Sequence, residues 1–135
     1  MTLDVESAAA RLNQFGISKE ITSADTEAIV WCLDKVTAYI CNECNVDAVP
    51  VGLIPAAVDR VCGEHLRQKK LFSPDEFADI TADLGSAGAI TVGDTSVTFK
   101  TAAEADNGVT DVDSFIRALL SEGDDQFSCF RKVRW

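Results

Sequence analysis

The stretch that decides the fold is Ile29-Val-Trp-Cys-Leu-Asp-Lys-Val-Thr-Ala-Tyr-Ile40, in which apolar residues recur every three or four positions. This interval matches the 3.6-residue turn of an α-helix. Thr22 or Ser23 can cap the start of the helix, with Glu27 in its first turns. The sequence therefore predicts a long helix whose apolar stripe is Ile29, Val30, Leu33, Val36, Ile40 and Cys44.

This stripe is wide, because Trp31, Ala38 and Tyr39 place apolar bulk on other faces of the same helix. A helix that is apolar on more than one face is either central in its domain or half-covered by a neighbouring subunit. The pattern therefore already hints at a protein partner.

The same periodicity predicts further helices on both sides of this stretch. One helix is expected at residues 3–15, ending at Gly16, and another begins after the turn at residues 50–55. The latter should pack antiparallel to the long helix through Ile54, Ala57, Val58, Val61, Cys62, His65 and Leu66. Residues 73–78 suggest a short helical turn, and a last helix is expected at about 111–122. We expect a mainly α fold, a small bundle of about four helices.

Residues 84–108 differ in composition from the rest, being rich in Gly, Ala, Ser, Thr and Asp. Within them, residues 89–92 and 96–100 alternate around Gly93-Asp-Thr95, which predicts a β-hairpin inserted in the bundle, with an arm at about 86–108. A two-stranded hairpin is barely stable alone in water. We therefore expect it to pair or pack against something outside the monomer, through Ile90, Val92, Val97 and Phe99.

Composition and charge narrow the possible functions. A length of 135 residues suits one domain, residues 1–135, and a net charge of −10 disfavours binding to nucleic acid phosphates. No apolar run approaches the roughly 20 residues of a membrane span, and Asp4 and Glu6 are untypical of a signal peptide, so we expect a cytoplasmic protein without membrane partners. Five cysteines without an export signal indicate reduced thiols.

One cysteine pattern offers an alternative function. Cys41 and Cys44 form one closely spaced pair, and Cys62 and His65 form a second, a spacing close to that of a Cys3His zinc site. The alternative is therefore a small zinc-binding interaction module. The simpler interpretation, which we favour, is that Cys44 and Cys62 lie on apolar helix stripes as small hydrophobic residues, with His65 beside them in the core. On this interpretation the chain needs no metal and no other cofactor.

Catalytic patterns find little support in the sequence. The chain has a single histidine, and it has neither a Gly-rich phosphate loop nor a nucleophile elbow. The acidic pairs Asp75-Glu76 and Asp124-Asp125 stand where carboxylates favour the start of a helix. We therefore expect that the protein is not an enzyme.

The stretch at about residues 124–135 differs in kind from the acidic body. Asp124 can cap a final helical turn, and the stretch combines aromatic with basic residues: Phe127, Phe130, Arg131, Lys132, Arg134 and Trp135. Such a segment is either a last piece of core with solvated charges or an anchor that docks on another protein, since aromatic residues and Arg are enriched at binding hot spots. Both interpretations stay open at this point.

Several segments together resemble the head-tail connector, or adaptor, proteins of long-tailed bacteriophages and related prophages. They are Tyr39-Ile-Cys-Asn-Glu-Cys-Asn-Val46 leading into Val49-Pro-Val-Gly-Leu53, Ala57-Val-Asp-Arg-Val-Cys-Gly-Glu64, Asp79-Ile-Thr-Ala-Asp-Leu-Gly85 and Phe127-Ser-Cys-Phe-Arg-Lys-Val-Arg-Trp135. The resemblance covers nearly the whole chain, but none of its pieces is a catalytic signature. Cys41 and His65 are not residues that the family requires.

The resemblance implies a structural virion protein at the head-tail interface, assembled in the cytoplasm of the host bacterium. Its subunits would form a ring, commonly a dodecamer, beneath the portal, and the ring would join capsid to tail and line the DNA channel without sequence-specific binding. The implied partners are the portal protein, copies of the chain itself and a stopper or tail-completion protein. The docking tail at about 124–135 would engage the portal, and the hairpin would meet a neighbouring subunit or the next tail component. An acidic lumen that repels DNA agrees with the net charge.

Overall fold

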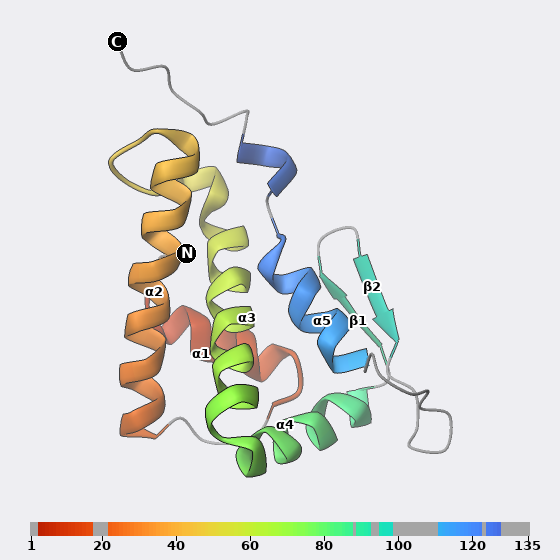
Figure 1. The fold of residues 1–135 in the computed structure, drawn as a ribbon. Coiled ribbons are helices and arrows are strands. Elements are labelled where there is room, and N and C mark those ends of the chain that lie inside the picture. Colours follow the sequence, from red (N-terminus) through yellow and green to blue (C-terminus); the bar gives the residue numbers. More distant parts are fainter. Residues whose placement is uncertain are drawn as a thin grey trace.

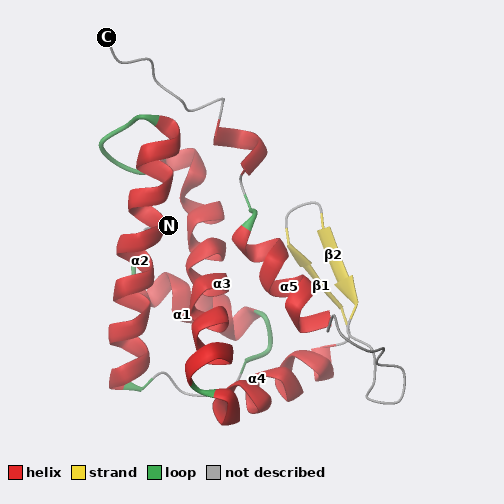
Figure 2. Ribbon diagram, in the orientation of Figure 1, coloured by secondary structure: helices red, strands yellow, loops and turns green. Residues whose placement is uncertain are grey.

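The structure is a computed structural model that describes residues 3–17, 22–87, 89–92, 95–98, 111–122 and 124–127. Helices predominate in these residues, so the expectation of a mainly helical fold is confirmed (Figure 2). Within them the α-helices are α1 (Val5–Gln14), α2 (Ser23–Cys44), α3 (Ile54–Phe72), α4 (Pro74–Ala87) and α5 (Asp111–Leu120). Short 3-10 turns cover Val51–Leu53 and Asp124–Gln126.

Helix α3 is the centre of the fold, and the other helices pack around it (Figure 1). Every residue from Ala56 to Leu66 is buried, including charged Asp59, Arg60 and Glu64. A helix that is buried on all sides must satisfy its charged groups inside the protein, because an unpaired buried charge is costly. The sequence predicted a single apolar face on this helix, whereas the stretch from Ala56 to Leu66 is buried on every side.

Helices α2 and α3 stand side by side in opposite directions, as the sequence predicted (Figure 1). Thr22 caps α2 and forms a reciprocal capping box with Asp25, and Asn45 ends the helix in the left-handed region with φ 57°. The buried face of α2 consists of Asp25, Ile29, Cys32, Val36, Ile40 and Cys44. Val30 of the expected stripe is instead 44% exposed, because Cys32 occupies the core position.

Helix α1 crosses behind α2 and α3 (Figure 1) and closes one side of the core. Its N-cap Asp4 accepts a hydrogen bond from the backbone N–H of Ser7 at 2.8 Å. Buried Leu12 lies on its inner face, and buried Phe15 is the residue that caps its C-terminal end. The ring of Phe15 meets Phe115 of α5 edge to face, with 5.0 Å between ring centroids. Helix α1 thereby connects α3 to α5.

Helix α4 corrects the expectation of a brief helical turn at residues 73–78. It extends from Pro74 to Ala87, because Phe77 and Ile80 lie at helical spacing and pack against the core. Ile80 is only 4% exposed. The sequence did not predict this continuation, because Gly85 and Ser86 have weak helix propensity. Tertiary packing outweighs that propensity in the folded chain.

Strands β1 (Ala89–Val92) and β2 (Thr95–Thr98) follow α4 and pair antiparallel, with Ile90 opposite Val97. They lie beside α5 of the same chain (Figure 1). On its other side α5 packs closely on α3. At Gly63 an added Cβ would lie 2.9 Å from the Cβ of Leu119, so a residue without a side chain is needed where these two helices meet.

Among the described residues, no helix combines the length and the apolar character that crossing a membrane would need.

Candidate functional site

The predicted docking tail is described only as far as Phe127. Phe127 is 4% exposed, and its ring lies 6.0 Å from the Tyr39 ring of α2, centroid to centroid. The thiol of Cys44, at the end of α2, donates a weak hydrogen bond to the Phe127 carbonyl at 3.8 Å. Phe127 is therefore part of the core. The other predicted tail residues lie outside the described residues: Phe130, Arg131, Lys132, Arg134 and Trp135.

Arg60 of α3 holds the turn that leads to Phe127. Its Nε donates to the Glu122 carbonyl at 2.6 Å, its Nη2 pairs with the Asp124 carboxylate, and its Cζ lies 4.9 Å from the Phe127 ring centroid and 5.2 Å from that of Tyr39. Because Arg60 is only 6% exposed, these contacts replace the water that its charge has lost. Arg60 thus holds Phe127, the point at which the described part of the chain ends, against the bundle.

A hollow of about 250 Å³ lies beside this point, between α2, α3 and α5. The carboxylate of Glu64 accepts from Lys35 at 3.3 Å and from Arg67 at 3.1 Å, so this buried acid is paired from both sides. Lys35 also lies 5.5 Å from the centroid of the Trp31 ring. The hollow is lined by Lys35, Val36, Tyr39, Arg60, Glu64 and Leu120. It combines apolar walls with already paired charges, which suits contact with a protein better than proton transfer.

The hairpin residues are placed only in part. Ile90 and Val97 form a cross-strand pair, and Val92 pairs with Thr95. Phe99 lies outside the described residues. The strands lie beside α5, so they already have a neighbour within the chain. The predicted contact of these residues with a neighbouring subunit or tail component stays a prediction.

The four residues of the zinc alternative are not brought together. Cys44 lies at the end of α2 near Phe127, whereas the Cys62 thiol donates to the Ala8 carbonyl of α1 at 3.5 Å. The reason is the antiparallel pairing of α2 and α3, which places Cys32 rather than Cys44 beside Cys62. Among the described residues, no group of three or more His, Cys, Asp or Glu side chains is arranged to hold a metal ion. The convergence that zinc requires is therefore missing.

Burial also decides the chemistry of the thiols. It raises the pKa of Cys32 to about 11, with Glu64 adding to the effect, and it raises the pKa of Cys62 further. Thiols with raised pKa values stay protonated and are poor nucleophiles and poor metal ligands. Both residues therefore act as small hydrophobic residues in the core, as the simpler interpretation expected for Cys62.

His65 lies beside a network of charges where α2, α3 and α4 meet. Lys69 pairs with both Asp25 and Glu76, which ties the three helices together. His65 is 4% exposed, and its Nδ1 makes no hydrogen bond within the described part of the chain. Burial lowers the pKa of His65 below 6.5, although the nearby carboxylates of Asp25 and Glu76 oppose this effect. His65 is therefore neutral in the folded protein at neutral pH.

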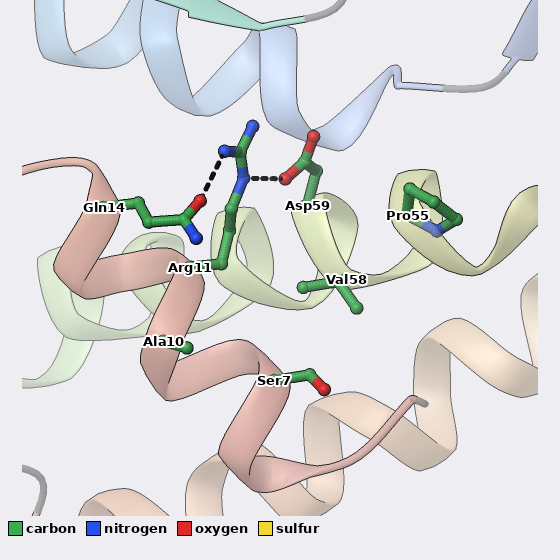
Figure 3. A pocket seen from close by; sticks show the side chains of 7 residues that line it. All are labelled: Ser7, Ala10, Arg11, Gln14, Pro55, Val58 and Asp59. Carbon is green, nitrogen blue, oxygen red and sulfur yellow. Dashed lines mark hydrogen bonds and ion pairs between the residues drawn. The ribbon is translucent and has the colours of Figure 1, made fainter. Parts of the chain in front are cut away.

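A second hollow, of about 360 Å³, lies between α1 and α3 (Figure 3). The Arg11 guanidinium reaches from α1 to the Asp59 carboxylate at 2.7 Å and also donates to the Gln14 side chain at 2.9 Å. Ser7 lines the same hollow, but the single histidine of the chain is buried elsewhere, and Arg11 and Asp59 already pair with each other. The arrangement offers Ser7 no base and gives no support to nucleophilic catalysis.

Two kinds of residue were not predicted from the sequence: charged residues that are buried and large apolar residues that are exposed. Arg60 and Glu64 are charged residues within the most buried stretch of α3. Their positions among apolar residues in the sequence could have indicated that they are buried. Large apolar side chains are conversely exposed: Val30, Trp31, Tyr39, Val51, Leu71 and Phe72. Only Trp31 and Tyr39 among them had been singled out from the width of the α2 stripe.

Comparisons of the chain with known protein families, with characterised proteins and with solved structures found no match. The resemblance to head-tail connectors therefore stays a prediction from the sequence.

Proposed function

We propose that this chain is a head-tail connector (adaptor) subunit, a structural protein that forms a ring beneath the portal and joins capsid to tail. The observation that carries the proposal is the exposure of large apolar side chains in the part of the chain that the structure describes. Trp31 is 57% exposed and Phe72, at the end of α3, is 80% exposed, while α3 is enclosed only from Ala56 to Leu66. Apolar surface left over after the core has formed is typical of protein contact sites.

The proposal gives a role to each region. Phe127 anchors the last described turn to the bundle, so residues 128–135, with their aromatic and basic side chains, start from a fixed point and engage the portal. The hairpin acts as an inserted arm toward a neighbouring subunit or a tail component. The net charge of −10 suits the wall of a channel through which DNA passes without binding.

Co-elution with the portal protein of the same virus or prophage tests the proposal. The full chain should elute with the portal in size-exclusion chromatography. A variant cut after Phe127 should keep its helical signal, because Phe127 retains its contacts, but should no longer co-elute. A matched control replaces Arg117, an exposed base of α5, with Gln and should bind the portal normally. Failure of the full chain to co-elute under all conditions would contradict the proposal.

A further inference from the structure

Two exposed surfaces of the domain carry apolar side chains together with charges of opposite sign. The acidic face is on α2 and consists of Glu27, Val30, Trp31 and Asp34, all exposed. Lys35 borders this face, with its ammonium 5.5 Å from the Trp31 ring centroid, and its charge is paired with Glu64 at 3.3 Å. The basic corner is at the end of α3 and consists of Arg67, Lys70, Leu71 and Phe72, also all exposed.

The acidic face points away from the core. Residues 27, 30, 31 and 34 fall on one side of a helix with 3.6 residues per turn, and the buried residues Ile29, Cys32 and Val36 fall on the other. Val30 is 44% exposed and Trp31 is 57% exposed. An apolar pair between two carboxylates is therefore presented on the outside of the longest helix.

The basic corner comes directly after the enclosed part of α3. Burial ends at Leu66, and the last turn carries Leu71, 63% exposed, and Phe72, 80% exposed. Arg67 pairs with Glu64 at 3.1 Å, so its position on this corner is fixed. Consecutive exposed Leu and Phe are uncommon on a protein surface, where large apolar side chains normally occur singly.

We propose that the basic corner of one copy of this chain packs against the acidic face of a second copy. Charge complementarity selects the pairing, because two acidic faces or two basic corners would bring like charges together. Trp31 and Phe72 supply the apolar contact, and aromatic residues are enriched at such contacts. The contact joins two different surfaces, which is the kind of interface from which a ring of identical subunits is built. The inference deepens the proposed function by naming the surfaces through which copies meet.

Charge reversal tests the pairing directly. The variant Glu27→Lys/Asp34→Lys makes both surfaces basic, and the variant Arg67→Glu/Lys70→Glu makes both acidic. Each alone should weaken self-association at least about tenfold in sedimentation velocity, because like charges then meet. An equimolar mixture of the two should regain association, since each acidic surface again finds a basic one. The chain that carries all four substitutions should associate with itself for the same reason.

Matched controls keep the test specific. Glu6→Lys/Asp47→Lys changes the net charge by the same amount at exposed positions on α1 and in the loop after α2, and should leave association unchanged. Helical circular dichroism and thermal melting should show that every variant is folded. The variant Trp31→Ser/Phe72→Ser removes the apolar contact without reversing charge, so it should also weaken association.

Two results would overturn the inference. One is a wild-type chain that stays monomeric up to about 1 mM, the range in which even weak protein contacts are populated. The other is a mixture of the two reversed variants that regains no association. This test uses the chain alone and does not depend on the portal. If the two reversed variants associate as expected but the chain does not bind the portal, the connector function is contradicted and the contact between copies is still supported.

Discussion

Helices α2 and α3 pack against each other, but they differ in how much of their surface is buried. Every residue of α3 from Ala56 to Leu66 is buried, whereas α2 buries one face and exposes Val30, Trp31 and Tyr39 on others. The difference indicates a division of labour. Changes in the buried stretch of α3, Ala56 to Leu66, should act on folding, whereas changes on the outer side of α2 should act on association and leave folding nearly intact.

The largest expected effect comes from removing the buried cation of α3. Arg60→Ala removes the hydrogen bond to the Glu122 carbonyl and the contacts with Tyr39 and Phe127. The free energy of unfolding should fall by about 2–4 kcal/mol, because buried polar contacts and packing are lost together. Urea unfolding measures this change.

The matched change on α2 is Lys35→Ala. Lys35 also pairs with a carboxylate, that of Glu64, but its side chain is 43% exposed. Its removal should cost no more than about 1 kcal/mol, as for other solvent-accessible ion pairs. Equal losses in the two variants would contradict the division between the helices.

The next effect concerns the close approach of α3 and α5. Gly63→Ala places a Cβ 2.9 Å from the Cβ of Leu119, which is attached directly to the backbone of α5 and cannot swing away. The helices must separate, at a cost of about 1–3 kcal/mol in the free energy of unfolding. The control Ala38→Ser, on the exposed side of α2, should change it by less than about 0.5 kcal/mol. A Gly63→Ala variant as stable as the wild type would show that this contact is not tight.

A smaller effect should appear as a dependence on pH. The pKa of His65 is lowered in the folded chain, so the unfolded chain binds a proton more readily, and the free energy of unfolding should fall as pH drops below 6.5. One such proton contributes a slope of at most about 1.4 kcal/mol per pH unit. His65→Leu should flatten the dependence between pH 6.5 and 5. Chemical denaturation at several pH values measures it.

Asp25 provides a separate pH window that serves as a control. Burial alone would raise its pKa, but hydrogen bonds from Lys69 and the Thr22 backbone hold the pKa below 3.8. The stability from this carboxylate is present above pH 3.8 and is lost as pH falls further through the lowered pKa. This acid loss should therefore persist in His65→Leu. If the free energy of unfolding of His65→Leu kept the same dependence on pH above pH 5 as the wild type, that dependence would come from groups other than His65.

The smallest effect is a difference in thiol reactivity. Cys41 lies half-buried on α2, whereas Cys32 and Cys62 are buried and have raised pKa values. Iodoacetamide should modify Cys41 much faster than the other two in the folded protein, because only an accessible thiolate reacts. Peptide mass spectrometry measures the rates. Comparable rates at Cys41 and Cys62 would contradict the enclosure of α3.

The sequence predicted the elements better than their surroundings. Periodicity and caps located α1, α2, α3 and α5, because these signals are local to each helix. The extent of α4 was missed, since the burial of Ile80 is a tertiary effect. The enclosure of Arg60 was missed for the same reason, because its partners lie about sixty positions away in the chain.

The candidate sites show the same limit. The spacing of Cys41, Cys44, Cys62 and His65 permitted a metal site, but the pairing of α2 and α3 separates the two pairs. Spacing within one helix turn is local information, whereas convergence of two helices depends on their register. The basic corner with Leu71 and Phe72 was likewise visible only once the end of core burial at Leu66 was known.

Electron microscopy of the portal with and without this chain is the decisive test of the connector function. An added ring should appear at one end of the portal in the mixture, with weaker or incomplete rings when Glu27→Lys/Asp34→Lys replaces the wild type. An unaltered portal, with the wild-type chain remaining monomeric beside it, would contradict the connector function.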